Sequence, residues 1–161
     1  MANYTGANVI TTSDVLKYQP DAFDFGISTT ATETTNFLAQ TTNDILRQLR
    51  IEWWPVYKTN VFTDITVLNT AEMDNTKVNL DQFERAGIYL FLGRFYLPAL
   101  TKFRPETEKD RFERMSEYYM SEYNKEWRSI LEDGVEYDAT ADGTIQVNER
   151  EPLHGFRRLT R

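Results

Sequence analysis

The chain has 161 residues, no cysteine, one histidine and a formal net charge of −7. The lack of cysteine excludes disulfide bonds and thiolate metal ligands, and one histidine argues against a histidine-based metal site or a catalytic triad. No run approaches the roughly eighteen apolar residues that span a bilayer, and the N-terminus lacks the basic start and apolar run of a secretory signal. We therefore expect one soluble intracellular domain with a sizeable core and no membrane contact.

The first helix is predicted at about residues 12–18. Hydroxyl and carboxylate side chains at positions 12–14 can accept hydrogen bonds from the free N–H groups of its first turn. Pro20 cannot continue the helix and is expected to end it. The side chains predicted to pack against the rest of the protein are Val15, Leu16 and Tyr18.

A second helix is predicted from about Glu33 to Trp54, because apolar residues recur about every four positions along it. Pro55 should limit this helix at its end. Residues 56–78 follow, and their apolar side chains alternate poorly with Thr and Asn. This stretch favours some extended structure, either a pair of strands or an ordered loop.

The third helix has a clear start signal and is apolar nearly all round, so we expect it to be central. Asn79 is a good N-cap, and Gln82 stands three residues later, where a capping box has its second member. Pro98 should kink or end the helix. One face is predicted to carry Leu80, Phe83, Gly87, Leu90, Phe91 and Arg94.

The fourth helix is predicted over residues 105–133 and begins at Pro105, a favoured first helical residue. Acidic residues in its first turns complement the positive end of the helix dipole. Gly134 can adopt the left-handed conformation that ends a helix. The apolar stripe of this helix is predicted to contain Phe112, Met115, Tyr119, Tyr123, Trp127 and Ile130.

After Gly134 the apolar period changes to two, which predicts a small β-hairpin over residues 135–149 that turns at Asp142–Gly143. Its alternating apolar residues are Val135, Tyr137, Ile145 and Val147. The segment also matches the ligand spacing of a calcium loop, at Asp138, Thr140, Asp142 and Glu149. Pro152 and Gly155 would break the helix that follows such a loop, so a plain hairpin is the favoured interpretation.

The last twelve residues, 150–161, carry four arginines and one glutamate, and therefore +3 of the total charge. Residues 1–149 then carry −10. Apolar residues spaced by three lie among the arginines of this arm, a composition typical of segments that dock onto another protein. A disordered solubilising end and a nucleic-acid contact through the arginines are the alternatives. The residues concerned are Arg150, Leu153, Phe156, Arg157, Arg158, Leu159 and Arg161.

Signals for catalysis are weak. The sequence has no Gly-rich nucleotide-binding motif, and no cofactor is expected. His154 lies in the arm, where a surface contact is the simpler interpretation. A cell-wall glycosidase stays open as an alternative, because the fourth helix carries the carboxylate pairs Glu113/Glu117 and Glu122/Glu126. Such an enzyme needs one carboxyl group in an apolar pocket, whereas these pairs lie on a charged helix face, so we expect no enzymatic activity.

The elements together predict a mainly α fold. Residues 1–134 form a core like a four-helix bundle, residues 135–149 a small C-terminal β-hairpin, and residues 150–161 an extended basic arm. Five segments carry this layout in order: ITTSDVLKY, RQLRIEWW, RAGIYLFLGRFYLPAL, ERMSEYYMSEYNKEWRSILEDG and EYDATADGTIQVNE. With the Arg-rich end, the layout resembles the head-to-tail connector (adaptor, or head-completion) proteins of tailed bacteriophages. The resemblance covers most of residues 10–161, and residues 56–78 depart from it by their length.

The resemblance implies a structural role in virion assembly. Members of this family form a ring of their own copies, usually twelve, beneath the portal protein of a DNA-filled capsid. In this chain Glu149–Arg161 would dock into the portal, and the opposite face would receive tail-completion or tail terminator proteins. The apolar hairpin residues would extend sheet pairing between neighbours. The location implied is the virion neck after synthesis in the host cytoplasm, and the acidic body would let DNA pass without specific binding.

Overall fold

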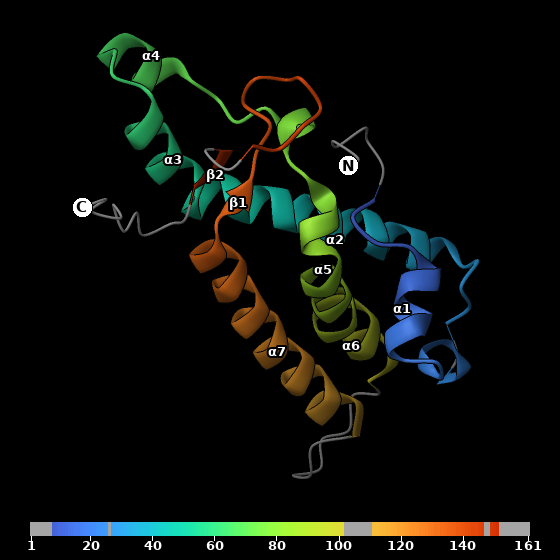
Figure 1. The fold of residues 1–161 in the computed structure, drawn as a ribbon. Coiled ribbons are helices and arrows are strands. Elements are labelled where there is room, and N and C mark those ends of the chain that lie inside the picture. Colours follow the sequence, from blue (N-terminus) through green and yellow to red (C-terminus); the bar gives the residue numbers. More distant parts are fainter. Residues whose placement is uncertain (1–7, 26, 102–110, 147–148, 152–161) are drawn as a thin grey trace. The chain divides into compact units, whose positions relative to one another are not determined.

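A computed structural model of the chain describes residues 8–25, 27–101, 111–146 and 149–151. This part of the chain is mainly α-helical, as the sequence predicts (Figure 1). It divides into two compact units, and α2 and α7 contribute residues to both. We call residues 8–44 and 83–127 the helical unit, and residues 45–82 and 128–151 the tail unit.

Helix α1, Thr12–Tyr18, has the predicted bounds, and a 3₁₀ turn, Ala22–Phe25, follows it. Its N-cap is Thr11, whose hydroxyl accepts a hydrogen bond from the N–H of Asp14 while the Asp14 carboxylate accepts from the N–H of Thr11 at 2.9 Å. Val15 is fully buried. Tyr18 is about half exposed but packs edge-on against Tyr89, with 6.4 Å between the ring centroids. Leu16 is exposed, contrary to the prediction, because a two-turn helix buries only one side.

Helix α2, Thr32–Glu52, ends slightly before its predicted end. Pro55 does not terminate the helical run but lies in the first turn of α3, Trp54–Val61. A proline is tolerated there because the N–H that it lacks would have no partner within the helix. Pro55 therefore starts a second helix and does not merely limit the first.

Helices occupy most of residues 56–78, so the predicted extended structure is limited to the end of this stretch, where Val78 forms an antiparallel bridge with Tyr137. The β-branched residues that favoured strands lie in α4, Ile65–Thr70, and a 3₁₀ turn follows at Asn75–Lys77. The carboxylate of Asp64 caps α4 by accepting a hydrogen bond from the N–H of Thr66 at 2.8 Å. This local cap outweighs the weak strand propensity of a short segment.

The third predicted helix is continuous but changes its winding along its length. Asn79 caps it, since its side-chain oxygen accepts a hydrogen bond from the N–H of Asp81 at 3.3 Å. The predicted end at Pro98 does not occur, because the helix continues for two residues beyond this proline. Because Pro98 has no N–H for the carbonyl of Arg94, an α-helical bond is missing there, and a π-helical stretch accommodates the loss. The four parts are a 3₁₀ turn at Leu80–Phe83, α5 at Glu84–Leu90, the π-helix at Phe91–Tyr96 and α6 at Leu97–Leu100.

Helix α7, Arg111–Asp133, corresponds to the fourth predicted helix, and its predicted start at Pro105 lies outside the described residues. It ends before Gly134, which has a φ of 101° and donates its N–H to the carbonyl of Ile130 at 3.0 Å. The predicted glycine stop is therefore confirmed. The predicted stripe is buried in the second half of α7, at Tyr123, Trp127 and Ile130, and half-buried before it, at Phe112, Met115 and Tyr119.

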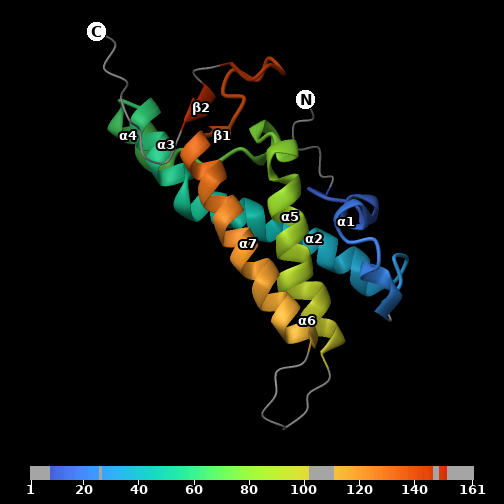
Figure 2. The same cartoon turned by 60° about the horizontal axis from the view of Figure 1, so that its bottom comes forward.

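Within the helical unit, α7 runs antiparallel to the helix formed by α5 and α6 (Figure 2). The two approach closely at Gly93, where an added Cβ atom would lie 2.9 Å from the backbone nitrogen of Met120. The hydroxyl of Ser116 donates to the Gly93 carbonyl at 2.6 Å. The core of this unit includes Val15, Phe83, Ala86, Ile88, Phe91, Leu92 and Tyr96.

The tail unit contains the ends of α2 and α7, helices α3 and α4, and two short strands, β1 at Val135–Glu136 and β2 at Arg150–Glu151. Its core includes Ile45, Leu49, Trp53, Tyr57, Val78, Val135 and Tyr137. In the part of the chain that the structure describes, no helix has the length and apolar character needed to cross a bilayer.

Candidate functional site

The root of the basic arm is paired with β1. The two strands are antiparallel, with Val135 opposite Glu151 and Glu136 opposite Arg150. The prediction of the hairpin's second strand is therefore wrong, because residues 145–146 form no strand and β1 pairs instead with the start of the arm. Val147 lies outside the described residues.

The other edge of β1 is also occupied. The N–H of Asn79 donates to the carbonyl of Glu136 at 3.1 Å, and the N–H of Asp138 donates to the carbonyl of Lys77 at 2.8 Å. Between these bonds, Val78 and Tyr137 form an antiparallel bridge. The segment after α7 is thus held on both sides, by the chain before the third helix and by the arm.

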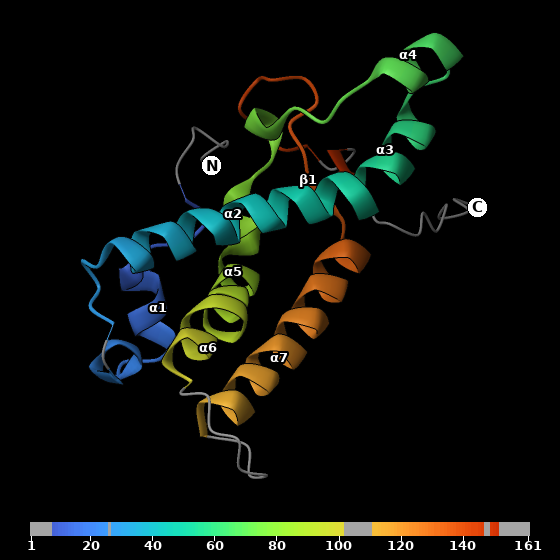
Figure 3. The ribbon, with the colours of Figure 1, turned by 180° about the vertical axis from the view of Figure 1, so that it is seen from behind.

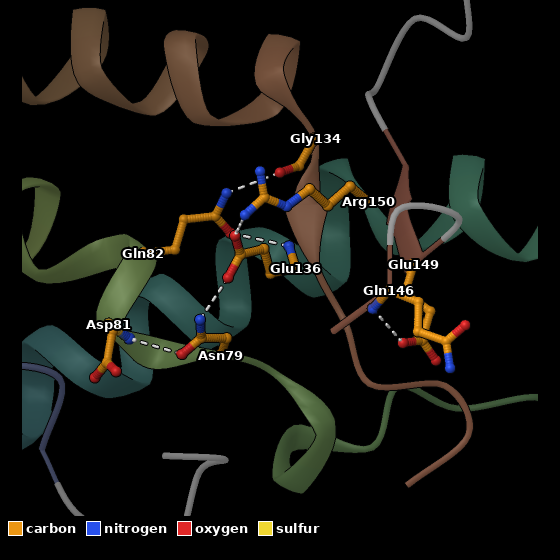
Figure 4. A network of polar contacts seen from close by, with 8 residues as sticks. All are labelled: Asn79, Asp81, Gln82, Gly134, Glu136, Gln146, Glu149 and Arg150. Carbon is orange, nitrogen blue, oxygen red and sulfur yellow. Dashed lines mark hydrogen bonds and ion pairs between the residues drawn. The ribbon is translucent and has the colours of Figure 1, made fainter. Parts of the chain in front are cut away.

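A polar network fixes this arrangement (Figure 4). The nearly buried carboxylate of Glu136 accepts hydrogen bonds from the side-chain amide of Asn79 and from the guanidinium of Arg150. The side chain of Gln82 donates to the carbonyl of Gly134 at 2.7 Å and accepts from the N–H of Glu136 at 3.0 Å. Gln82 thus bonds outside its own helix and does not close the predicted capping box. A buried carboxylate needs such partners, and Arg150 supplies the opposite charge.

An aromatic cluster packs against the same segment. The ring of Tyr137 lies 5.2–5.7 Å from the rings of Trp53, Trp54 and Tyr57. Its hydroxyl accepts a hydrogen bond from the N–H of Asp74 at 3.2 Å, and burial raises the pKa of Tyr137, so the phenol stays neutral. These contacts anchor β1 to α3 and hence give the arm a rigid root.

The acidic loop between β1 and β2 is held by its own carboxylates. Asp138, which is fully buried, accepts hydrogen bonds from the N–H groups of Asp142 and Gly143 at 3.2 and 2.9 Å. Glu149 accepts from the N–H groups of Gln146 and Thr140 at 2.9 and 3.0 Å, and these bonds lower the pKa of Glu149. Gly143 has a φ of 79°, which suits the predicted turn.

This loop contains the four candidate calcium ligands, the carboxylates of Asp138, Asp142 and Glu149 and the hydroxyl of Thr140. The carboxylates of Asp138 and Glu149 accept hydrogen bonds from backbone N–H groups of the loop, and both also accept from the Thr140 hydroxyl, at 3.4 and 3.2 Å. Among the described residues, no three His, Asp or Glu side chains gather as a set of metal ligands. The spacing that matches a calcium loop therefore belongs to a loop that is held by hydrogen bonds from its own backbone N–H groups to Asp138 and Glu149.

The predicted docking residues fall into two groups. Glu149 and Arg150 are described, and both are committed to contacts inside the tail unit. The others lie outside the described residues: Leu153, Phe156, Arg157, Arg158, Leu159 and Arg161. Of the residues predicted to pair between neighbours, Val135 and Tyr137 are buried in the tail unit, and Ile145 is half-buried.

The two carboxylate pairs of α7 differ in their surroundings, since Glu122 and Glu126 are half-buried and Glu113 and Glu117 are not. Glu122 forms an ion pair with Lys125 at 2.5 Å, and Glu126 lies 3.6 Å from Arg85. Glu113 and Glu117 are exposed. The structure thus adds no observation in favour of a glycosidase, which requires a carboxyl group in an apolar environment.

Comparison of the chain with protein-family models, with curated proteins and with solved structures found no match. The site therefore has to be interpreted from its own geometry. The residues that build it and that sequence reasoning missed are Asn79, Gln82 and Glu136 as a network, and Trp53, Trp54 and Tyr57 as the support of Tyr137. In the sequence, the cluster of Trp and Tyr residues near residue 55 was the one feature that pointed to this part of the site.

Proposed function

We propose that the chain is a structural subunit of the neck of a tailed bacteriophage, which joins the portal to the tail without chemistry of its own. Its helices serve as a bundle-like core, and the end of the chain, after the paired strands, serves as the docking arm. The observation that carries the proposal is the firmly held root of a basic and apolar terminal segment.

A rigid root matters for docking. The arm begins in β2 beside a buried carboxylate and an aromatic cluster, so the position of its first residues is set by the folded unit. Pre-organised attachment lowers the entropy lost when a segment binds a partner. Apolar anchors flanked by arginines then supply the contacts that usually dominate an interface.

The assembly proposed is a ring of copies, usually twelve in the family that the sequence resembles. Many weak arm contacts made at once hold a ring far more tightly than one arm holds one subunit. The tail side would receive a tail-completion or tail terminator protein. The charge of −10 on residues 1–149 suits a channel that DNA passes without binding, because like charges repel.

Electron microscopy of the protein mixed with portal-bearing, DNA-filled capsids of its own virus tests this proposal. We expect a ring of density on the portal vertex that is absent from capsids alone. Capsids that bind no protein at micromolar concentration would contradict the proposed function.

A further inference from the structure

Exposed apolar side chains gather in one stretch of the tail unit. Among the described residues of this unit, every large apolar side chain that is exposed lies between residues 51 and 67. Ile51 at the end of α2 is 63% exposed, and Ile65 on α4 is 74% exposed. Val61 and Val67 are each more than two-fifths exposed. We call these four side chains the 51–67 surface; they lie on three helices, and Ile65 and Val67 point to different sides of α4 because they are two positions apart.

Helix α4 has little support of its own. It lies beyond the end of α3 (Figures 1 and 3), and none of its side chains is buried. Asp64 caps its start, and the indole N–H of Trp54 donates to the carbonyl of Ala71 just after its end at 3.2 Å. A helix of six residues is not stable in water on such contacts alone. We therefore expect another segment to cover it.

The end of the same chain matches this surface in chemistry. Residues 152–161, which we call the distal arm, carry three arginines and no acidic residue, hence +3. Residues 51–67 carry two acidic residues and one lysine, hence −1, and Glu72 and Asp74 follow shortly after them. The apolar residues of the distal arm are Leu153, Phe156 and Leu159. Both the charge and the apolar character are thus complementary.

The distal arm is also long enough. It starts next to β2, and the neighbouring strand leads into Tyr137, whose ring lies 5.2 Å from that of Tyr57 on α3. Helix α3 has eight residues and is therefore about 12 Å long. The ten residues of the distal arm span up to about 33 Å when extended. A segment tethered so close has an effective concentration near the millimolar range.

We propose that, in the free protein, the distal arm binds across the 51–67 surface of its own chain. Leu153, Phe156 and Leu159 cover the exposed apolar side chains, and the arginines lie among the acidic residues around them. This contact needs no portal, so its failure would leave the proposed function standing. If both hold, the portal competes with the chain's own surface for the arm.

Hydrogen exchange on the isolated full-length protein tests the contact. The double variant F156S/L159S should speed the exchange of the α4 amides, those of Leu68 and Asn69, by about tenfold or more, because α4 loses its cover. The matched control T160A changes a polar residue of the same segment and should leave these rates unchanged. Equal exchange in the double variant and the unmodified protein would overturn the proposal.

Cross-linking identifies whose arm makes the contact. The chain has no cysteine, so the pair V67C/F156C introduces the only two thiols. On mild oxidation we expect a cross-linked monomer, formed about tenfold faster than from the control pair Y118C/F156C and at a rate independent of protein concentration. Tyr118 is more exposed than Val67, 59% against 41%, but belongs to the helical unit. Cross-linked dimers as the main product would assign the contact to a second copy and overturn the proposal.

Discussion

Arg150 is the first residue of the basic arm, yet its guanidinium pairs with the nearly buried carboxylate of Glu136. Asn79 also donates to that carboxylate, and Gln82 bonds the Gly134 carbonyl and the N–H of Glu136, which precede it in the backbone. The charge of Arg150 therefore stabilises the root of the arm, and in the proposed function the residues that follow it make the docking contacts.

Replacing Arg150 by alanine should lower the free energy of unfolding by about 1–2 kcal/mol, because Glu136 loses its cation in a poorly hydrated place. This figure allows for solvent screening of the half-exposed arginine. Urea unfolding measures the change. R128A, which removes an exposed arginine of α7, should have an effect near zero. Equal stability of the two variants would show that the ion pair contributes nothing.

Acid should weaken the loop through Glu149. Hydrogen bonds from the N–H groups of Gln146 and Thr140 hold the pKa of Glu149 below its ordinary value of 4.5. The carboxylate thus stabilises the fold above pH 4.5, and this contribution is lost as the pH falls through the lowered pKa. E149Q should be less stable than the unmodified protein at pH 7, and the difference should shrink at pH 3. A difference that is constant across this range would refute the assignment.

At the scale of elements, features set by neighbouring residues were predictable and those set by distant ones were not. Helix α1 and the end of α7 follow from capping side chains and Gly134, which act within one turn. Most of residues 56–78 were mispredicted because their β-branched residues suggest strands, whereas Asp64 caps a helix. The pairing of β1 with β2, and the use of Gln82, depend on residues more than ten positions away. Contacts between residues so far apart leave no local sequence pattern from which they could be predicted.

The close approach of α7 and the π-helical stretch gives a prediction for G93A. The added Cβ atom would lie 2.9 Å from the backbone nitrogen of Met120, so the helices must move apart. We expect a loss of about 1–2 kcal/mol in unfolding free energy, less than full overpacking because alanine favours the helix. Adding M120A should not restore stability, since the clash is with backbone. Thermal unfolding monitored by circular dichroism measures both effects, and full rescue by M120A would contradict this explanation.

At the scale of the whole molecule, the charge distribution distinguishes between the two candidate partners of the arm, DNA and the portal protein. The body carries −10 and the arm +3, so DNA should be repelled by most of the protein. Mobility-shift assays with duplex DNA at about 0.15 M salt should therefore show no stable complex. Binding that falls steeply with salt and disappears in a protein ending at residue 151 would favour a nucleic-acid role. That truncation keeps β2 and its ion pair, so the folded root is retained.

Docking of the arm to the portal is the central claim, and one binding measurement tests it most directly. Portal-bearing capsids are sedimented with the full-length protein, with F156S/L159S and with T160A. We predict that T160A binds like the unmodified protein and that the double variant binds at least about tenfold more weakly, since buried apolar anchors dominate such interfaces. Equal binding of all three proteins would contradict the claim that the arm joins this chain to the portal.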